Sequence, residues 1–503
     1  MTLANKTIKN ALAGIIGFAW PILLALVSMP YIVHKMGNDA YGVLVLVISV
    51  LGFFAFLDLG VTNASIKYIA ESYVRDDTEE IGKIIGSSLL LYLVTGIAGG
   101  LVIIVMTNNL VQRILDIPLA YRADSTFAFH LAACGFILNM ILGVFSAVLK
   151  AVQRYDIAMK VNIFISSLLT FSTIGLLYFG YGLREVVIAN FLSSLVSLGV
   201  YAVVAKKMLP TVVIRFSIET GTLKKLISFG AFSLLAMLAT TILFQLDRIL
   251  IGTYSGAAQV AFYAVPASIA FRIHGFVANI MAVVFPLCSE LHATGQKVKL
   301  QELYLKASKY SFIIGISIAT PLVVLSGEVM KYWMGNEYAQ KSSLVLMLLA
   351  LSSFFVSMST IPALLLDGIG KPRVNASFAV LSALMNILLC LVLIPRYGVT
   401  GAALANLANF IVVVLYLVTV DVRILHIGLF RFVAEIWSRP LVTALVQGLA
   451  TMFIIAPFIS GIGTLIAGLM ASVGVFCLCA LAFKAVNDDD LALFRGFVRS
   501  RYK

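Results

Sequence analysis

The chain has 503 residues, of which 61% are hydrophobic and only 12% are charged. Soluble domains are nearer 45–50% apolar and about 25% charged, so this composition excludes a water-soluble fold and a large aqueous catalytic domain. The net charge of +13 would suit nucleic acid in a soluble protein, but here its distribution indicates membrane topology.

Apolar segments long enough to cross a bilayer, roughly 20 residues each, recur along the whole chain. We predict fourteen spanning helices, at residues 10–33, 41–62, 84–106, 125–149, 158–180, 185–205, 226–252, 259–287, 309–330, 341–366, 374–395, 399–421, 438–458 and 462–485. The first is too long for the core of a signal peptide and is predicted to be a membrane anchor.

Basic residues lie mostly on one side of these spans. Of the 36 Lys and Arg residues, 27 fall on the side of the two termini, seven fall on the opposite side, and Arg248 and Arg272 lie inside spans. Because positive residues stay in the cytoplasm during insertion, both termini are predicted to be cytoplasmic.

The two halves of the chain resemble each other at an offset of 211–217 residues. Three pairs of segments match in order: 181–190 (YGLREVVIAN) with 397–406 (YGVTGAALAN), 149–154 with 366–371, and 18–24 with 229–235. Six helices per repeat place both copies in the membrane in the same orientation, related by a pseudo-two-fold axis along the membrane normal. Such repeats enclose a cavity that rocking opens alternately to each side, so the pattern indicates transport.

The predicted fold is therefore an all-α polytopic membrane protein, with two pseudo-symmetric six-helix bundles and two extra C-terminal helices. The N-terminal bundle covers residues 1–208 and the C-terminal bundle covers 226–425. Residues 209–225 are predicted to form an amphipathic cytoplasmic linker whose lysines lie at the lipid headgroups. Residues 426–503 hold the two extra helices and a basic cytoplasmic tail.

Ionisable residues inside the spans are the main functional candidates, because each costs a few kcal/mol near the bilayer centre unless it faces a cavity or a partner. Arg272 lies about thirteen residues, or roughly 20 Å, from the outer end of the eighth span. An arginine in a watery cavity suits phosphate, which it holds through forked hydrogen bonds. We predict a substrate site for pyrophosphate and sugar made of Arg272, Arg248, Lys67 and Asn63.

Three further ionisable residues, Asp58, Asp247 and His274, are candidates for coupling transport to a proton or sodium gradient. Structural alternatives stay open for each of them. Asp247 can pair with another helix, Asp58 can cap the turn that follows it, and His274 can be a hydrogen-bonded interior histidine. Phosphate-loop, zinc-protease and serine-hydrolase motifs are missing from the sequence, so we expect no catalytic residues, no metal site and no cofactor beyond the coupling ion.

Short motifs in chain order carry a family resemblance. They are Pro30-Tyr31-Ile32, Gly37, Tyr41-Gly42, Asp58-Leu59-Gly60, 247–252 (DRILIG) and 395–403 (PRYGVTGAA). With them the chain resembles the polysaccharide transporters, the O-antigen and oligosaccharide flippases of the multidrug, oligosaccharidyl-lipid and polysaccharide exporter superfamily. The resemblance covers nearly the whole chain and implies that the first, second, seventh and eighth helices flank a central cavity.

The resemblance also implies a function. The expected substrate is an oligosaccharide unit of O-antigen, capsule or exopolysaccharide linked through pyrophosphate to a polyprenol, moved to the outer leaflet of the bacterial inner membrane by alternating access. The implied partners are membrane lipids, a polysaccharide polymerase and a chain-length regulator. The alternatives are a cation-driven multidrug exporter, a peptidoglycan-precursor flippase and a membrane glycosyltransferase or polymerase.

Overall fold

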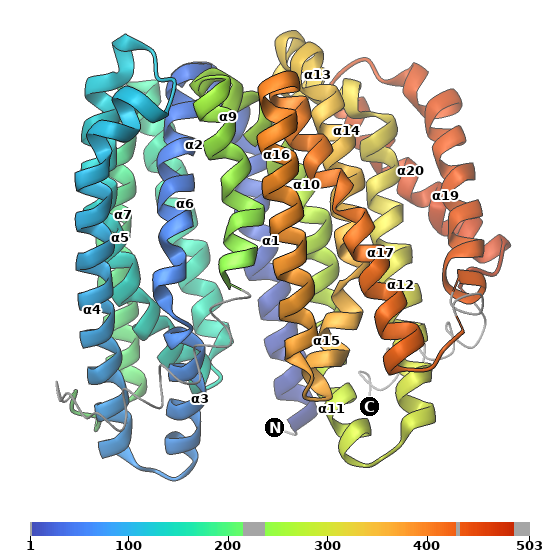
Figure 1. Cartoon of the computed structure of the whole chain (residues 1–503), viewed down its shortest axis with the longest axis horizontal. Helices are drawn as coiled ribbons and strands as arrows, with labels where there is room; N and C mark the ends of the chain where they lie inside the picture. The colour runs from blue at the N-terminus through green and yellow to red at the C-terminus, as the bar shows by residue number, and fades with distance from the viewer. Residues whose placement is uncertain (1–2, 215–236, 429–432, 487–503) are drawn as a thin grey trace. The chain divides into compact units, whose positions relative to one another are not determined.

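The computed structural model describes residues 3–214, 237–428 and 433–486, and within these ranges every regular element is a helix. The helices form two compact units (Figure 1): unit 1 comprises residues 1–264 and 383–402, and unit 2 comprises 265–382 and 403–503. The later part of the predicted linker, with Lys224 and Lys225, the repeat segment 229–235 and most of the basic tail lie outside the described residues. The predicted bundle boundaries stay a prediction.

Unit 1 holds the first half of the chain, and its last helix, α10, continues into unit 2. Its elements are α1 (Leu3–Met36), α2 (Asn38–Phe53), η1 (Phe54–Asp58), α3 (Val61–Val74), α4 (Thr78–Asn109), η2 (Leu110–Ile114), η3 (Leu119–Tyr121), α5 (Arg122–Ala151), α6 (Tyr155–Tyr178), α7 (Leu183–Met208), η4 (Ile242–Leu246), α9 (Asp247–Tyr254) and α10 (Ala257–Met281). The label η marks short helical turns: η1 and η3 are 3-10 helices, and η2 and η4 are π-helices.

Unit 2 holds most of the second half, while the middle of its long helix α16 belongs to unit 1. Its elements are α11 (Val284–Ala293), α12 (Lys297–Val324), α13 (Ser326–Met334), α14 (Asn336–Met358), α15 (Thr360–Gly368), α16 (Pro372–Ala408), α17 (Phe410–Val418), η5 (Thr419–Ile424), η6 (Val433–Trp437), α19 (Ser438–Ala450), η7 (Thr451–Ile455), η8 (Ala456–Phe458) and α20 (Ile462–Ala482).

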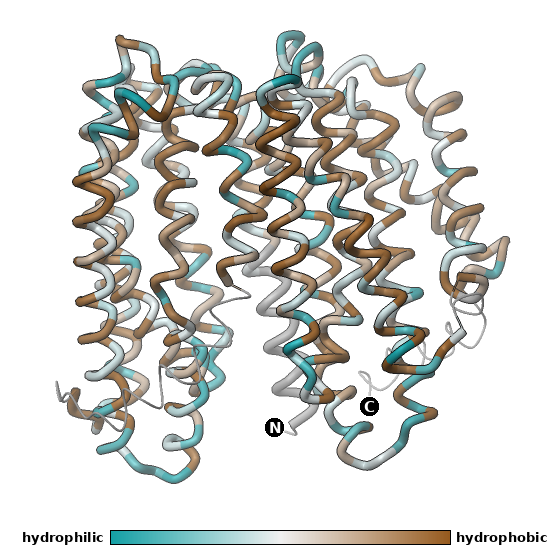
Figure 2. Tube along the Cα trace, viewed as in Figure 1, coloured by the Kyte–Doolittle hydropathy of each residue, from teal (hydrophilic) through white to brown (hydrophobic). Residues whose placement is uncertain are grey.

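Twelve helical segments of the described chain are long and apolar enough to cross a membrane. Figure 2 shows hydrophobic residues along these helices and hydrophilic ones gathered at their ends and turns. One segment, Pro372–Ile424, has 53 residues and would be about 80 Å long as a straight helix, far more than the roughly 30 Å hydrocarbon core.

This long segment folds back on itself, in agreement with the two spans predicted at 374–395 and 399–421. Gly398 has φ 55° and ψ −132°, which breaks the helix. A Cβ on Gly401 would lie 2.2 Å from the carbonyl oxygen of Leu393, so the chain after the break packs against the chain before it. The predicted seventh span, 226–252, is described only in its later part, which contains η4 and the start of α9.

The predicted second span at 41–62 corresponds to the apolar segment Asn38–Asp58, but its last residues do not continue one α-helix. The helix α2 ends at Phe53, one short 3-10 stretch follows, and Leu59 and Gly60 adopt left-handed φ values of 53° and 73°. The side chain of Asp58 accepts a hydrogen bond from the backbone N–H of Thr62 (3.1 Å). An aspartate in that place satisfies one of the orphan N–H groups at the start of a new helix, α3.

The internal repeat is visible in the turns. In the turn after α5, Gln153 has φ 56° and its N–H donates to the carbonyl of Lys150 (3.0 Å); in the turn after α15, Gly370 has φ 75° and donates to Asp367 (3.2 Å). These turns are 217 residues apart. Two more left-handed pairs, Gly37 with Gly256 and Asp76 with Gly295, are each 219 residues apart. The backbone therefore repeats at nearly the offset found in the sequence.

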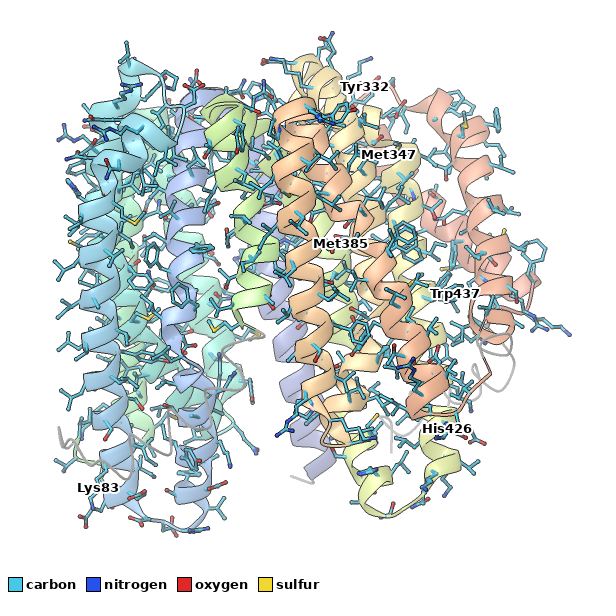
Figure 3. All side chains as sticks on the ribbon, viewed as in Figure 1. Lys83, Tyr332, Met347, Met385, His426 and Trp437 are labelled. Carbon is cyan, nitrogen blue, oxygen red and sulfur yellow. The ribbon has the colours of Figure 1, made fainter. Side chains whose placement is uncertain are left out.

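Each unit has its own packed interior. In unit 1, α3, α4, α5 and α7 bury a cluster that includes Val61, Ile69, Ile84, Tyr92, Val148 and Ala205. The helix α4 begins where Asp77 accepts the N–H of Glu80 (2.9 Å), and Lys83 lies near this end (Figure 3), 3.4 Å from Glu79.

In unit 2, the two extra C-terminal helices pack on α12. The amide of Gln447 in α19 donates to the carbonyl of Ser317 in α12 (3.0 Å) and to Ser472 in α20 (3.2 Å). Trp437, labelled in Figure 3, stacks on Phe312 with ring centroids 6.0 Å apart. Polar and aromatic contacts thus attach the final helix pair to the rest of the unit.

Candidate functional site

The predicted coupling residue Asp58 lies at the break between η1 and α3 in unit 1. Its Oδ1 accepts both the N–H of Thr62 and the hydroxyl of Tyr92, and the Thr62 and Tyr92 hydroxyls are themselves 2.7 Å apart. These bonds tie the start of α3 to α4. The structure therefore shows that Asp58 fixes a turn, as the structural alternative expected, and leaves its role in coupling a prediction.

The second predicted carboxylate, Asp247, is the first residue of α9 and is completely buried. Its Oδ2 accepts the hydroxyl of Tyr263 from α10, and its Oδ1 accepts the backbone N–H of Arg248 (2.7 Å). The π-helical turn η4 directly precedes it, and such turns are frequent at functional sites. Asp58 and Asp247 are thus held by different tyrosines on different helices of unit 1.

Arg248 follows Asp247, and its backbone N–H donates to Asp247 Oδ1 (2.7 Å). The Nε atom of Arg248 is buried and has no hydrogen-bond partner among the described residues, although the side chain as a whole is partly exposed. A cation inside a span with an unused donor fits the predicted role of Arg248 as an anion-binding residue.

Two glycines bring α2 into close contact with α9 and the start of α10. A Cβ on Gly42 would lie 1.8 Å from the carbonyl oxygen of Ala257, and a Cβ on Gly252 would lie 2.5 Å from Leu46. The backbone of Asp116 continues this contact, donating to Gly252 (2.9 Å) and accepting from Ala257 (3.2 Å). We call the contact of α2 with η4, α9 and the start of α10 the α2–α9 seam. The close approach of the helices explains why the motifs Tyr41-Gly42 and 247–252 (DRILIG) carry glycine at positions 42 and 252.

Arg272 and His274 lie on α10 in unit 2. Arg272 is the sixteenth residue of that helix, about 22 Å from its start, and its side chain is exposed in the unit. The Nδ1 atom of His274 is buried and has no hydrogen-bond partner among the described residues. The structural alternative predicted a hydrogen-bonded interior histidine. At Nδ1 of His274 the described residues provide no such bond.

The other two predicted substrate residues, Asn63 and Lys67, are exposed on α3 one turn apart. Lys67 lies 3.9 Å from Glu71 and 4.9 Å from the centre of the Tyr68 ring. Exposed ion pairs of this kind contribute about 0–1 kcal/mol. Lys67 is thus already in contact with an acidic and an aromatic neighbour on its own helix.

Sequence reasoning missed two polar groups of unit 2. Asp421 in η5 is completely buried and accepts the hydroxyl of Tyr304 in α12 (2.6 Å). Asn375 in α16 donates to Asp367 (2.7 Å) and accepts the hydroxyl of Tyr416. Asp421 lies at the end of a predicted span, where charged residues are common, so nothing in the sequence singles it out. Asn375 is not ionisable, so a search for charges inside the spans does not find it.

Over the described residues, these features define an all-helical protein with many membrane-spanning segments and with buried polar side chains on those segments. Two solved structures share the fold. An inward-facing multidrug MATE transporter is 16% identical over 81% of this chain and 97% of its own, with a TM-score of 0.70. The lipid II flippase MurJ, in an inward closed conformation, is 14% identical over 96% of this chain and 99% of its own, with a TM-score of 0.75.

The chain belongs to the polysaccharide biosynthesis protein family, whose model matches residues 5–292. A second family model, MatE, matches residues 233–392. A protein of Shigella flexneri named as an O-antigen transporter is 24% identical over 79% of this chain and 93% of its own. A Haloferax volcanii protein named as a low-salt glycan biosynthesis flippase is 22% identical over 82% of both chains. The predicted family resemblance and fold class are confirmed.

Proposed function

We propose that this chain is a flippase that moves a polyprenyl-pyrophosphate-linked oligosaccharide from the cytoplasmic to the outer leaflet by alternating access. The observation that carries the proposal is the similarity to the O-antigen transporter over 93% of that protein's length, joined to membership of the polysaccharide biosynthesis family. The Shigella flexneri and Haloferax volcanii relatives are a transporter and a flippase by name, which supports transport as the activity in this proposal.

In this proposal the two arginines inside the spans bind the pyrophosphate or acidic sugars. Arg272 is an exposed residue in the later part of α10, and Arg248 keeps a buried Nε donor without a partner among the described residues. Asn63 and Lys67 are exposed on α3 and would meet the headgroup near the cytoplasmic surface. Arginine suits this substrate because its planar donors match phosphate oxygens in pairs.

Asp247, Asp58 and His274 are the proposed residues for coupling to H⁺ or Na⁺. Asp247 is supported best, because a carboxylate that is completely buried and bonded to Tyr263 changes its interactions strongly when it gains or loses a charge. Asp58 also holds a turn, so its removal would affect folding as well as coupling.

We further propose that the chain lies in the bacterial inner membrane with both termini in the cytoplasm. Twelve apolar helices in the described chain support a multi-span membrane protein, and the basic residues on one side support this orientation. A polysaccharide polymerase and a chain-length regulator are the proposed protein partners, because they would act on the translocated unit.

A multidrug exporter is the second candidate, and the MatE match to residues 233–392 is the observation that favours it. Such an exporter would protect cells from toxic organic cations whether or not the cell makes a surface polysaccharide. A peptidoglycan-precursor flippase of the same fold would instead be required to prevent lysis.

Substituting Arg272 tests the proposed substrate site. In a host that lacks its own copy, Arg272→Ala should abolish surface-polysaccharide assembly while the protein still reaches the membrane. Arg396→Ala, at an exposed position of the turn in α16, is the matched control and should assemble polysaccharide normally. Normal assembly by Arg272→Ala would remove Arg272 from the site.

A further inference from the structure

The later part of α10 presents three exposed side chains on one face of the helix. Arg272, Phe276 and Asn279 are four and three residues apart, the spacing that places side chains above one another on a helix, and all three are exposed. We call these three residues the α10 stripe. Arg272 is the first exposed residue of α10, and residues 260–267 before it are all buried. The helix is therefore enclosed over 260–267 and open along the α10 stripe.

Within the part of the chain that the structure describes, the α10 stripe keeps unused binding groups. The side chain of Arg272 forms no ion pair or hydrogen bond there, and the ring of Phe276 contacts no other aromatic ring. The amide nitrogen of Asn279 donates to the carbonyl of Gly275 (2.8 Å), while Asn279 Oδ1 accepts no hydrogen bond from a described residue. The stripe therefore offers a ligand a cation, an aromatic face and a hydrogen-bond acceptor.

Lipid tails do not suit this face of α10. The helix is largely buried: in the most apolar 18-residue window of its span, 61% of the residues are buried, against 17% in α6. An arginine inside a span faces the protein interior or water, because lipid does not solvate its charge. An asparagine acceptor gains no hydrogen bond from a hydrocarbon chain. The burial of α10 and the charge of Arg272 therefore favour a polar ligand.

A glycan linked through pyrophosphate matches the order of groups along the α10 stripe. Arg272 can pair with phosphate oxygens, and Phe276 lies about 6 Å farther along the helix axis. The sugar joined to the pyrophosphate is the group that reaches Phe276.

The chemistry of a sugar suits both Phe276 and Asn279. The C–H groups on one face of a sugar ring pack on the negative face of an aromatic ring. The hydroxyl groups of the same sugar donate to an amide oxygen such as Asn279 Oδ1. An organic cation would instead meet the positive charge of Arg272.

We propose that Phe276 and Asn279 form a subsite for the first sugar of the lipid-linked oligosaccharide, next to the pyrophosphate at Arg272. The sugar ring packs on Phe276, and one of its hydroxyl groups donates to Asn279 Oδ1. Since the predicted topology places the end of α10 on the cytoplasmic side, the sugar lies on the cytoplasmic side of the pyrophosphate. This subsite rests on the proposed flippase function and deepens it by adding recognition of the glycan.

Binding measurements on purified protein test the subsite with two probes. One is the lipid-linked oligosaccharide extracted from a host strain that lacks this chain, and the other is undecaprenyl pyrophosphate without sugar. The wild type should bind the sugar-bearing lipid about thirtyfold more tightly, the combined value of one ring contact and one hydrogen bond at about fivefold each. Phe276→Leu and Asn279→Leu should each lower this affinity ratio about fivefold.

A conservative variant and a matched control separate recognition from structure. Phe276→Tyr keeps an aromatic face and should keep the wild-type affinity ratio. Phe171→Leu, which replaces a ring that is 61% exposed on α6, should keep it as well. Without lipid, Phe276→Leu and Asn279→Leu should unfold at the wild-type temperature, because exposed side chains contribute little to stability.

The outcomes for the subsite and for the flippase function are distinct. The subsite would be overturned by a wild type that binds both lipids equally, or by an affinity ratio that persists in both Phe276→Leu and Asn279→Leu. An equal fall of the ratio in Phe276→Tyr or in Phe171→Leu would also overturn it. A wild type that binds neither lipid would instead overturn the flippase function.

Discussion

Replacing Gly42 with alanine places a methyl group where the α2–α9 seam has no room. The new Cβ would lie 1.8 Å from the carbonyl oxygen of Ala257, and real Cβ contacts are essentially never shorter than 3.0 Å. The two backbones must therefore separate by at least about 1.2 Å, the difference between these distances. The carbonyl cannot rotate away as a side chain would, and the N–H of Ala257 is held by Asp116.

The expected free-energy change follows from two opposing effects. Overpacking of this kind costs about 1–3 kcal/mol, and occasionally more. Alanine in a helix interior recovers about 0.5–1 kcal/mol relative to glycine. Because the obstacle is backbone, we expect Gly42→Ala to lower the free energy of unfolding by about 1–2 kcal/mol.

Gly199→Ala is the matched control, because no atom lies within 4 Å of a Cβ built on Gly199 in α7. The assay is unfolding of the purified variants in mixed micelles of dodecyl maltoside and sodium dodecyl sulfate. Gly199→Ala should be stabilised by about 0.5–1 kcal/mol and Gly42→Ala destabilised. Equal stabilisation of both variants would refute the close packing of α2 on α10.

Four further substitutions have expected outcomes in the same unfolding assay. Tyr263→Phe removes the donor to the buried Asp247 carboxylate and should cost about 1–3 kcal/mol; an equal loss in an Asp247→Ala background would contradict the pairing. Gly370→Gln introduces a side chain at left-handed φ and should cost about 1 kcal/mol, whereas Gln153→Gly, at the repeat-related position, should be neutral or stabilising. Gly398→Ala should cost about 1–3 kcal/mol, and an unchanged midpoint would contradict the break in α16.

Much of the fold can be predicted from the sequence because few structures satisfy all backbone hydrogen-bonding groups of a chain in lipid. Apolar segments of about 20 residues must be helical to satisfy their backbone groups, so composition and length predict the spans. The repeat offset is also visible in sequence, and the left-handed turns at Gln153 and Gly370 reproduce it in the backbone. The break at Leu59 and Gly60 was missed because it lies within the last residues of an apolar segment, and hydrophobic periodicity does not register left-handed residues.

The candidate site was predictable only in part. Arg272, Arg248 and Asp247 are charges inside apolar runs, which makes them conspicuous in sequence. The close contacts of Gly42 and Gly252 depend on the register of α2 against α9 and the start of α10, which is not visible in one sequence.

Translocation by the purified chain is the most direct test of the flippase function. Proteoliposomes would carry the extracted lipid-linked oligosaccharide in both leaflets, and a membrane-impermeant glycosidase or periodate would consume only the outer glycan. With the wild type, consumption should proceed beyond the outer-leaflet share toward completion, and with Arg272→Ala it should stop at that share. Consumption that stops at the outer-leaflet share in wild-type vesicles, as in protein-free ones, would contradict the assignment of this chain as a lipid-linked oligosaccharide flippase.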